Sequence, residues 1–465
     1  MKSVGFFDTI AAISTPPGTG GIGIIRISGD KAISIVDGMF KSNFGKKIKD
    51  MKSHSMAYGK ITDKTGSVLD EVLISVMRAP NTYTKEDVVE INCHGGAVVL
   101  KGILDAVLNS GARMAEAGEF TKRAFLNGRI DLSQAEGIID VINSKTELSR
   151  DFALNALSGK LSESVNYIKD RLLKAAAAIE VAIDYPEYEI EKEDKTGLMS
   201  LFNEAEAKLS VMIQNSDMGR IIKEGLSAAI IGRPNAGKSS FLNRLLNEER
   251  AIVTDIPGTT RDMLEEFINL SGIPVKFIDT AGIRDARDGD IIEKIGIERS
   301  LKAAADADVI IFMIDGQKGI SDEDVKILEL TRGKKIIALI NKCDIKRDID
   351  KKILYEYVPE ENIAEVSVLK DMGVEKALER LKEMFLGGDI SFADAAMVSN
   401  ARQKAALSRA LENVKKAKEN LMTDVPEDII SMDIMEAVSA ISEITGENAD
   451  DALIDKIFSE FCIGK

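Results

Sequence analysis

The sequence predicts a multidomain chain of the α/β and α classes, in which an α/β nucleotide-binding domain is inserted into a helical bundle that follows a small α+β domain. Three observations support this prediction. A glycine-rich phosphate loop lies at residues 232–239, short apolar strands alternate with turns in the first quarter, and apolar residues with helical spacing occur on both sides of the loop. A length of 465 residues also suits about three domains.

The first domain is predicted over residues 1–118. Short apolar strands are expected at 23–27, 73–77 and 88–92, and a helix at 97–108. This mixture of strands and one helix is typical of a small α+β domain.

Helical spacing begins near Asp131, where Gln134 three residues later predicts a capping pair. The predicted helical domain has a first part at 119–216 and a second part at 385–465. In the first part, one apolar helix face is expected from Leu161, Val165, Ile168, Leu172, Ala176 and Ile179. Because a nucleotide-binding domain can present its two ends close together, residues 217–384 are predicted to be inserted between the two parts.

The phosphate loop reads Gly-Arg-Pro-Asn-Ala-Gly-Lys-Ser and follows the apolar run 228–231. Its glycines let backbone N–H groups close on phosphate oxygens, Lys238 reaches the β- and γ-phosphates, and Ser239 offers a hydroxyl to Mg²⁺. A glycine-rich turn without a ligand is the alternative, which the strand before and the amphipathic helix after disfavour. The nucleotide-binding residues predicted here are Asn235, Ala236, Gly237, Lys238, Ser239 and Ser240.

Two further motifs follow in the order that a Ras-like P-loop GTPase requires. Asp-Thr-Ala-Gly ends an apolar strand, and Asn-Lys-Cys-Asp closes the strand 336–340. The carboxylate of Asp344 can accept from guanine N1–H and N2–H₂, a donor pair that adenine lacks, so GTP is the predicted nucleotide. The binding residues expected from these motifs are Asp279, Thr280, Ala281, Gly282, Asn341, Lys342 and Asp344.

A first switch segment is expected at 254–262, where Thr260 is predicted to coordinate Mg²⁺; an ordinary Pro-Gly turn is the alternative. After the Asp-Thr-Ala-Gly motif, Ile283 occupies the position where many GTPases carry a glutamine that orients water. Hydrolysis must therefore use another group, and the acidic candidates are Asp285, Asp288, Asp290 and Glu293.

Composition narrows the function further. The formal charge of −15 argues against nonspecific nucleic-acid binding, although it is compatible with local basic patches. Three cysteines without metal-like spacing indicate a reducing, cytoplasmic protein, and no apolar run is long enough to predict a membrane span. With two histidines in the chain, histidine metal clusters are nearly excluded. Two basic groups are candidate RNA surfaces, although solvated faces explain them equally well: Lys46, Lys47, Lys49 and Lys52, and Arg402, Lys404, Arg409, Lys415, Lys416 and Lys418.

The chain also resembles a known family. Three segments carry this resemblance: Gly21-Ile-Gly-Ile-Ile-Arg-Ile-Ser-Gly29, Gly118-Glu-Phe-Thr-Lys-Arg-Ala-Phe-Leu-Asn-Gly128 and the tail Cys462-Ile-Gly-Lys465. The resemblance is to the MnmE (TrmE) family, and it covers the whole length of the chain. The resemblance implies a homodimeric, potassium-stimulated GTPase that works with the FAD-containing MnmG (GidA) protein. Together such proteins add an aminomethyl or carboxymethylaminomethyl group to C5 of the wobble uridine of certain tRNAs. The methylene comes from a folate, 5-formyl- or methylene-tetrahydrofolate.

The resemblance also implies roles for particular residues. Potassium ligands are Asn235, Thr254, Ile256 and Thr259; Glu293 is the catalytic glutamate, with Arg284 and Cys462 as further catalytic candidates; folate contacts are Arg26, Glu90, Arg129 and Lys465. Considered alone, Asn235 could brace the loop and the folate residues could be ordinary surface charges. The sequence departs from the family in a spacing from Gly282 to Glu293 about two residues longer, and in Ser367-Val-Leu369 where Ser-Ala-Lys is usual.

Two classes of function remain open. One is an enzyme, a GTP hydrolase coupled to tRNA uridine modification. The other is a regulatory GTPase switch that binds RNA or acts in ribosome assembly without modification chemistry. Both require the nucleotide motifs, whereas only the first requires the folate residues and the Cys-Ile-Gly-Lys tail.

Overall fold

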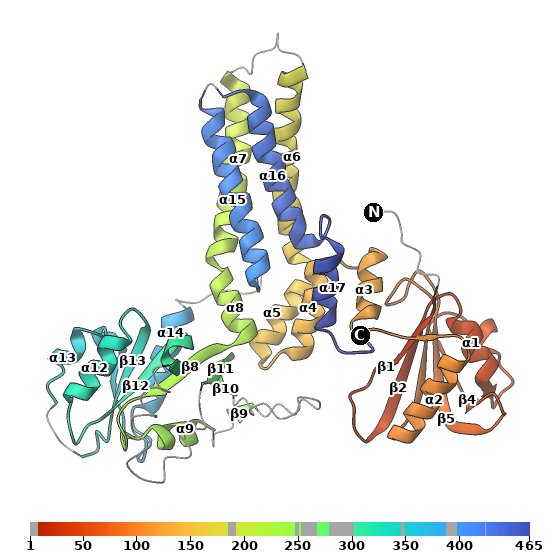
Figure 1. Ribbon diagram of the computed structural model, residues 1–465, viewed down its shortest axis with the longest axis horizontal. Coiled ribbons are helices and arrows are strands. Elements are labelled where there is room, and N and C mark those ends of the chain that lie inside the picture. The colour runs from red at the N-terminus through yellow and green to blue at the C-terminus, as the bar shows by residue number, and fades with distance from the viewer. Residues whose placement is uncertain are drawn as a thin grey trace.

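The structure is a computed structural model that describes residues 8–184, 192–246, 251–252, 267–278, 302–345, 349–386, 398–423 and 425–465. It has three parts: an N-terminal sheet domain, a stalk of long helices, and a second sheet domain that carries the phosphate loop (Figure 1). Within the described residues, no helix combines the length and the apolar character that crossing a membrane requires.

The N-terminal sheet domain has seven strands in the order β3-β4-β5-β6-β2-β1-β7. All neighbouring strands are antiparallel except β1 and β7. Its elements are β1 (Ile10–Ile13), β2 (Gly20–Ser28), α1 (Ala32–Met39), β3 (Phe40–Ser42), η1 (Ile48–Asp50), β4 (Ser55–Thr62), β5 (Val68–Met77), β6 (Val88–Gly95), α2 (Ala97–Asn109) and β7 (Arg113–Met114). The predicted strands are confirmed as parts of β2, β5 and β6, and the predicted helix as α2.

One face of this sheet is covered by helices, and the other, called here the open face, is exposed over β4 and β5. Apolar residues of α1 and α2 pack on alternate residues of the central strands, such as Ile25, Ile74 and Ile91, and form the domain core. Side chains of the intervening residues project from the opposite face. The strand registers align Tyr58, Leu73, Asn92 and Ile24 in one row across that face.

The stalk is built from helices that precede the phosphate loop in the sequence and helices that follow it. These are α3 (Glu119–Leu126), α4 (Leu132–Asn143), α5 (Glu147–Leu157), α6 (Lys160–Asp184), α7 (Lys192–Gln214), α8 (Ser216–Glu224), α15 (Ala401–Leu421), α16 (Glu427–Thr445) and α17 (Asp451–Ser459). The predicted apolar face from Leu161 to Ile179 is buried, and it packs in one core with residues of α7, α15 and α16. The predicted capping pair is also confirmed: Asp131 Oδ1 accepts from Gln134 N, and Gln134 Oε1 accepts from Asp131 N.

The second sheet has the order β14-β13-β12-β8-β11-β10-β9, and its central strands are parallel. Apolar cores lie on both faces, which explains why its strands are almost continuously apolar. The elements are β8 (Leu226–Ile231), α9 (Lys238–Leu246), β9 (Ala251–Ile252), β10 (Phe267–Leu270), β11 (Ile273–Phe277), β12 (Val309–Asp315), α12 (Asp322–Leu330), β13 (Lys335–Asn341), α13 (Lys352–Tyr355), η2 (Glu360–Asn362), β14 (Ile363–Glu365) and α14 (Val374–Leu386).

Helix α5 joins the stalk to the turn between β10 and β11. Thr146 is the N-cap of α5, and its Oγ1 donates a hydrogen bond to the carbonyl of Gly272 at 2.6 Å. The ammonium of Lys145 lies 3.2 Å from the centroid of the Phe267 ring. The β10–β11 turn is therefore held by the start of one stalk helix.

Candidate functional site

The phosphate loop connects β8 to α9 at the carboxyl edge of the parallel sheet, where nucleotides bind in folds of this kind. Two glycines are required there by both conformation and space. Gly232 has φ +141 and a Cβ on it would lie 2.2 Å from the Met313 carbonyl oxygen. Gly237 has φ +104 and a Cβ would lie 2.1 Å from Asn341 Nδ2. Any larger residue at either position would force the loop away from its supports.

Lys238, the first residue of α9, is held over this loop. Its Nζ donates to the carbonyls of Gly232 at 2.6 Å and Arg233 at 2.9 Å. Burial lowers the pKa of Lys238 to about 8. The same ammonium is positioned to exchange these carbonyls for phosphate oxygens, whose negative charge would favour its protonated form.

The predicted guanine motif braces the phosphate loop from β13. Asn341 Nδ2 donates to the Ala236 carbonyl at 2.9 Å, and its Oδ1 accepts from the backbone N–H groups of Lys342 and Val368 at 2.8 and 3.1 Å. Asp344 is exposed, as a carboxylate that reads a base edge must be. Three segments that are distant in the sequence thus meet at one buried amide.

Lys342 is fixed by an acidic residue that the sequence did not reveal. Its Nζ lies 2.7 Å from Oδ2 of Asp315, the buried last residue of β12. Hydrogen bonds and the charge of Lys342 outweigh the burial of Asp315 and lower the pKa of that carboxyl. The Lys342 stem is thereby held at the same sheet edge as the phosphate loop.

Arg233 ties the loop to α12 in a similar way. Its Nε lies 2.8 Å from Oδ2 of the fully buried Asp324, and its Nη2 donates to the Gly319 carbonyl at 2.7 Å. The same carboxylate oxygen of Asp324 caps α12 by accepting from the N–H and hydroxyl of Ser321. Arg233 and Asp324 are 91 positions apart, so no local sequence pattern indicates their contact.

Asn235 lies in the phosphate loop, and Ser239 and Ser240 lie in the first turn of α9. The other predicted nucleotide and metal residues lie outside the described part of the chain. Ile278 lies just beyond β11 and is the last described residue before the Asp-Thr-Ala-Gly motif. Its N–H donates to the Ala228 carbonyl. The predicted residues that the structure does not describe are Thr254, Ile256, Thr259, Thr260, Asp279, Thr280, Ala281, Gly282, Arg284 and Glu293.

A second cluster of predicted residues lies on the open face of the N-terminal sheet. Arg26 of β2 and Glu90 of β6 are register partners, and the Arg26 Nε lies 2.9 Å from Glu90 Oε1. The guanidinium of Arg26 lies 5.3 Å from the ring centroid of Tyr83, and that of Arg129 lies 4.5 Å from the same ring. Tyr83 therefore connects two predicted folate residues, a role that its place in a loop did not suggest.

The Cys-Ile-Gly-Lys tail closes over the same place. The Gly464 carbonyl accepts from Arg26 Nη1 at 3.3 Å and from Ser14 Oγ at 3.0 Å, and Ile463 forms a β-bridge with Ala117. Lys465 follows directly. Cys462 is exposed. The structure thus gathers Arg26, Glu90 and Arg129 with the tail, although they span nearly the whole sequence.

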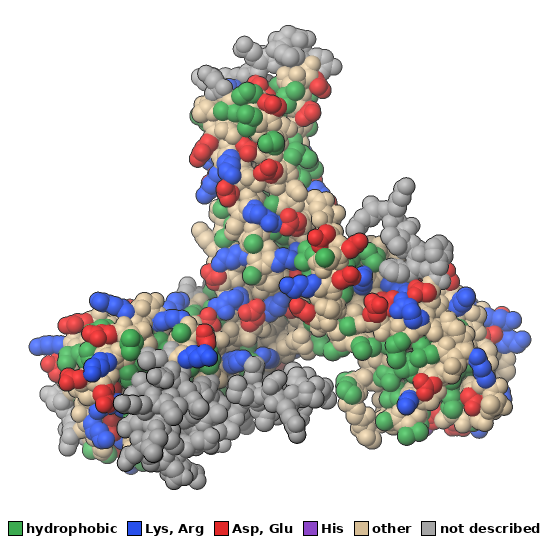
Figure 2. Space-filling model, viewed as in Figure 1, with side chains coloured by type: hydrophobic (Ala, Val, Ile, Leu, Met, Phe, Trp, Pro, Cys, Tyr) green, Lys and Arg blue, Asp and Glu red, His purple; other side chains and the backbone are tan. Residues whose placement is uncertain are grey.

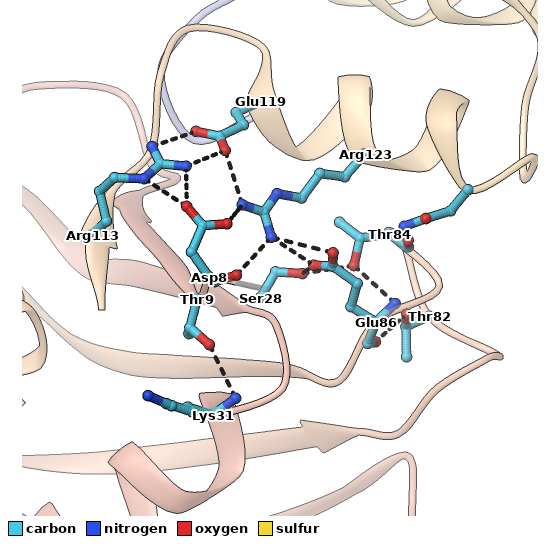
Figure 3. A network of polar contacts seen from close by, with 11 residues as sticks. Asp8, Thr9, Ser28, Lys31, Thr82, Thr84, Glu86, Arg113, Glu119 and Arg123 are labelled. Atoms are coloured by element: carbon cyan, nitrogen blue, oxygen red, sulfur yellow. Dashed lines mark hydrogen bonds and ion pairs between the residues drawn. The ribbon is translucent and has the colours of Figure 1, made fainter. Parts of the chain in front are cut away.

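A buried charge network supports the helix that leads to Arg129 (Figure 3). The fully buried guanidinium of Arg123 donates to Asp8 Oδ1 at 2.7 Å, to Glu119 Oε1 at 3.0 Å and to both Glu86 oxygens at 3.2 Å. Arg113 binds Glu119 and Asp8 from the other side, each at 2.7 Å. This network fixes α3 against the edge of the N-terminal sheet.

The parallel sheet with its phosphate loop and the Asn-Lys-Cys-Asp motif define a P-loop guanine nucleotide-binding protein, built together with an α+β domain and a helical stalk. Two family models match the chain: "MnmE helical domain" over residues 132–462 and "GTP-binding protein TrmE N-terminus" over residues 9–129. The chain belongs to the MnmE family of GTPases.

Individual relatives agree with this assignment. The tRNA modification GTPase MnmE of Alkaliphilus oremlandii is 48% identical over 98% of this chain and 99% of its own length. The protein of the same name from Clostridioides difficile is 45% identical, with 98% and 99% covered. Among solved structures, Era from Aquifex aeolicus is 28% identical over 40% of this chain and 66% of its own, with a TM-score of 0.27. That score is too low to indicate a shared overall fold.

Proposed function

We propose that the chain is a GTP hydrolase of tRNA modification, acting with an FAD-containing partner of the MnmG (GidA) kind in the cytoplasm. The pair would install an aminomethyl or carboxymethylaminomethyl group at C5 of the wobble uridine of certain tRNAs, using a folate one-carbon unit. One observation favours this function over a regulatory switch. The chain that carries the guanine nucleotide motifs also gathers Arg26, Glu90, Arg129 and its tail around Tyr83, an arrangement that a nucleotide switch does not need.

The proposed domain division is 1–118 for folate binding and dimerisation, 119–216 and 385–465 for the helical domain, and 217–384 for an inserted GTPase domain. The packing of α6 and α7 with α15 and α16 supports the insertion, because a single core contains helices from both sides of the phosphate loop. The position of Arg26 and Glu90 on the N-terminal sheet supports residues 1–118 as the folate-binding domain.

In the proposed nucleotide site, GTP binds over Lys238, with Mg²⁺ held by Ser239 and Thr260. A potassium ion would be bound by Asn235, Thr254, Ile256 and Thr259. Asn235 supports this proposal because its φ of +65 places its backbone in a left-handed turn inside the loop, a conformation that turns successive backbone groups toward one point. A cation beside the phosphates stabilises the charge that develops during transfer, and Glu293 would orient water with Arg284 nearby.

In the proposed folate site, Glu90 accepts the amide and amine edge of the pterin, while Arg26, Arg129 and Lys465 suit the glutamate tail. The Tyr83 ring holds the guanidinium groups of Arg26 and Arg129 close together, which favours binding of a negatively charged tail by both. Cys462 is the proposed nucleophile toward uridine, and its exposure makes it accessible.

The open face of the N-terminal sheet supports the proposed homodimer. Its exposed residues include Met56, Tyr58 and Leu73, with 56%, 40% and 43% of their surfaces accessible. These residues lie on β4 and β5, continuous with the row that contains Asn92 and Ile24. A second copy packed on this face would cover the apolar side chains and lie beside both Arg26–Glu90 pairs.

The first experiment tests the nucleotide site by steady-state GTP hydrolysis in KCl and in NaCl at equal ionic strength. The expected result is strong potassium stimulation that is lost in Asn235→Ala, and slow hydrolysis by Glu293→Ala in both salts. Equal rates in the two salts would remove the potassium site and favour the regulatory switch.

The second experiment tests the folate site by calorimetric titration with 5-formyl-tetrahydrofolate. Glu90→Gln replaces a charged acceptor by a neutral one and is expected to weaken binding roughly 10- to 100-fold, since hydrogen bonds to charged groups contribute about 1.5–3 kcal/mol. Glu71→Gln is the matched control, because Glu71 is an exposed carboxylate on the adjacent strand paired with Lys60. Equal affinities of the two variants would contradict the assignment.

A further inference from the structure

One surface of the N-terminal domain differs in charge from the rest of the chain. Residues 41–54, called here the basic edge, contain five lysines and one aspartate, a net charge of +4. Because the whole chain has a net charge of −15, the residues outside the basic edge together have a net charge of −19. All five lysines are exposed: Lys41, Lys46, Lys47, Lys49 and Lys52.

The five lysines are also free of carboxylate partners among the described residues, where none of them forms an ion pair. The other basic group, on α15, is largely neutralised: Lys404 pairs with Asp217, Lys416 with Glu412 and Lys418 with Glu206. Figure 2 shows positive and negative side chains interspersed over the stalk. The structure thus separates two basic groups that the sequence left equivalent.

The backbone of the basic edge is anchored to the domain core. Ile48 is fully buried and Met51 nearly so, under α1. Arg78, at the end of β5, donates from Nε to the Met51 carbonyl at 3.1 Å and from Nη2 to the Lys49 carbonyl at 2.6 Å. Because the buried side chains and the Arg78 hydrogen bonds hold this backbone against the core, the lysines project into solvent from a fixed backbone rather than from a mobile tail.

Phe44 lies in the same segment, and 77% of its surface is exposed. Its N–H donates to Ser42 Oγ at 3.1 Å, which holds the backbone of the turn but leaves the ring uncovered. An exposed aromatic ring flanked by unpaired ammonium groups is the combination that stacks on an unpaired base while contacting the flanking phosphates.

We propose that the basic edge contacts tRNA: its lysines bind backbone phosphates and Phe44 stacks on an unpaired base. This inference rests on the proposed function, which supplies tRNA as the substrate. Strand β3, which opens the basic edge, is four strands from β2 in the sheet order, or about 19 Å at the usual strand spacing. A stretch of a few stacked nucleotides spans that distance to the Arg26–Glu90 pair.

The test is tRNA binding by the full-length protein, followed by fluorescence anisotropy across a salt series. Replacing Lys46, Lys47, Lys49 and Lys52 together with alanine is expected to weaken binding at least tenfold. It should also reduce the slope of log K against log salt by about 0.7 for each lost phosphate contact. Phe44→Ala should lower affinity without changing the slope, and Phe44→Trp should restore it. The matched control replaces Lys404, Lys415, Lys416 and Lys418 with alanine.

GTP hydrolysis and folate binding that match the wild type will show that each variant is folded. Equal affinity and salt slope in the basic-edge and α15 variants would overturn the proposal while the proposed function stands. Wild-type protein that binds no tRNA would overturn both. Loss of binding to the FAD-containing partner with tRNA affinity intact would instead make the basic edge a protein-docking surface and refute the RNA assignment.

Discussion

Replacing Arg123 with methionine is expected to destabilise the N-terminal domain by about 3 kcal/mol. Breaking a buried ion pair by removing one partner costs about 3–5 kcal/mol, because a charge stays behind without compensation. The lower end applies here. Glu119 keeps its pairing with Arg113, and Asp8 is half-exposed and can rehydrate. The uncompensated carboxylate is mainly Glu86, whose remaining hydrogen-bond donor in Figure 3 is Ser28.

Cys93 provides a domain-specific measurement, which is needed because a multidomain protein does not unfold in one step. It is buried in the N-terminal core, and burial raises its pKa to about 11. With Cys343→Ser and Cys462→Ser as background, Cys93 is the single thiol. Its reaction with a disulfide reagent then requires opening of the domain. A loss of about 3 kcal/mol corresponds to roughly 100-fold faster labelling.

Two controls separate charge from packing. Arg150→Met removes an exposed arginine paired with Asp151 and should leave the labelling rate of Cys93 unchanged. Adding Glu86→Gln to Arg123→Met should recover part of the loss, since it removes the stranded charge. Labelling of Arg123→Met within about fivefold of the parent would refute the reasoning, and no recovery in the double variant would assign the loss to packing.

The network also sets a pH dependence. Burial opposes ionisation of Glu119, but hydrogen bonds from Arg113, the Glu116 N–H and Arg123 outweigh it, so the pKa of Glu119 is lowered. The pKa of Asp8 is lowered in the same way, with burial again opposed by the two arginines. Because the folded pKa values lie below the unfolded ones, the stabilisation is present above about pH 4 and is lost as the pH falls through the folded values. Labelling with a reagent that reacts in acid should accelerate in that range, and less so in Arg123→Met.

Three further predictions concern the nucleotide-binding part. Bound phosphate favours the charged form of Lys238, whose pKa in the nucleotide-free protein is about 8. Above that pH, GTP affinity should therefore fall by up to about tenfold per pH unit. Titration with a fluorescent nucleotide measures this, and an affinity that stays constant to about pH 9.5 would contradict it. Arg233→Lys and Asp324→Asn should each raise KM for GTP about tenfold with kcat unchanged, since they loosen the loop without touching the reacting atoms; a fall in kcat instead would place them in the chemical step. Thr146→Ala should remove about 1 kcal/mol from the contact of α5 with the Gly272 turn and speed amide exchange in β10 and β11, while Thr146→Ser should not.

Much of the fold could be predicted from periodicity. The six apolar positions from Leu161 to Ile179 recur every three or four residues, and all of them are buried, because a long helix in a bundle must bury one face. The phosphate loop was equally predictable, since its two glycines answer a local requirement for unusual φ and close backbone approach. A structural requirement that involves only neighbouring residues can therefore be predicted from a short sequence pattern.

The parts that escaped prediction depend on contacts between distant segments. Short strands such as β1 and β3 have too few residues for a clear alternation, and register with a neighbour defines them. No sequence pattern indicates that Arg123 contacts Asp8 and Glu86, because the sheet registers that bring these residues together have no local signature. Arg26 and Glu90 were expected to share a site through family resemblance alone, although the structure shows them as direct cross-strand partners.

The shared core of α6, α7, α15 and α16 has a consequence for synthesis on the ribosome. About 190 residues separate the end of α7 from the start of α15, which corresponds to roughly 10–40 s of translation at about 5–20 residues per second. During that interval α6 and α7 can pack only on each other, and the apolar surface that α15 and α16 later cover stays exposed while the nucleotide-binding segment is still being made. The nascent chain is therefore exposed to aggregation at this stage, and a chaperone that binds amphipathic helices would act on it before the stalk can close.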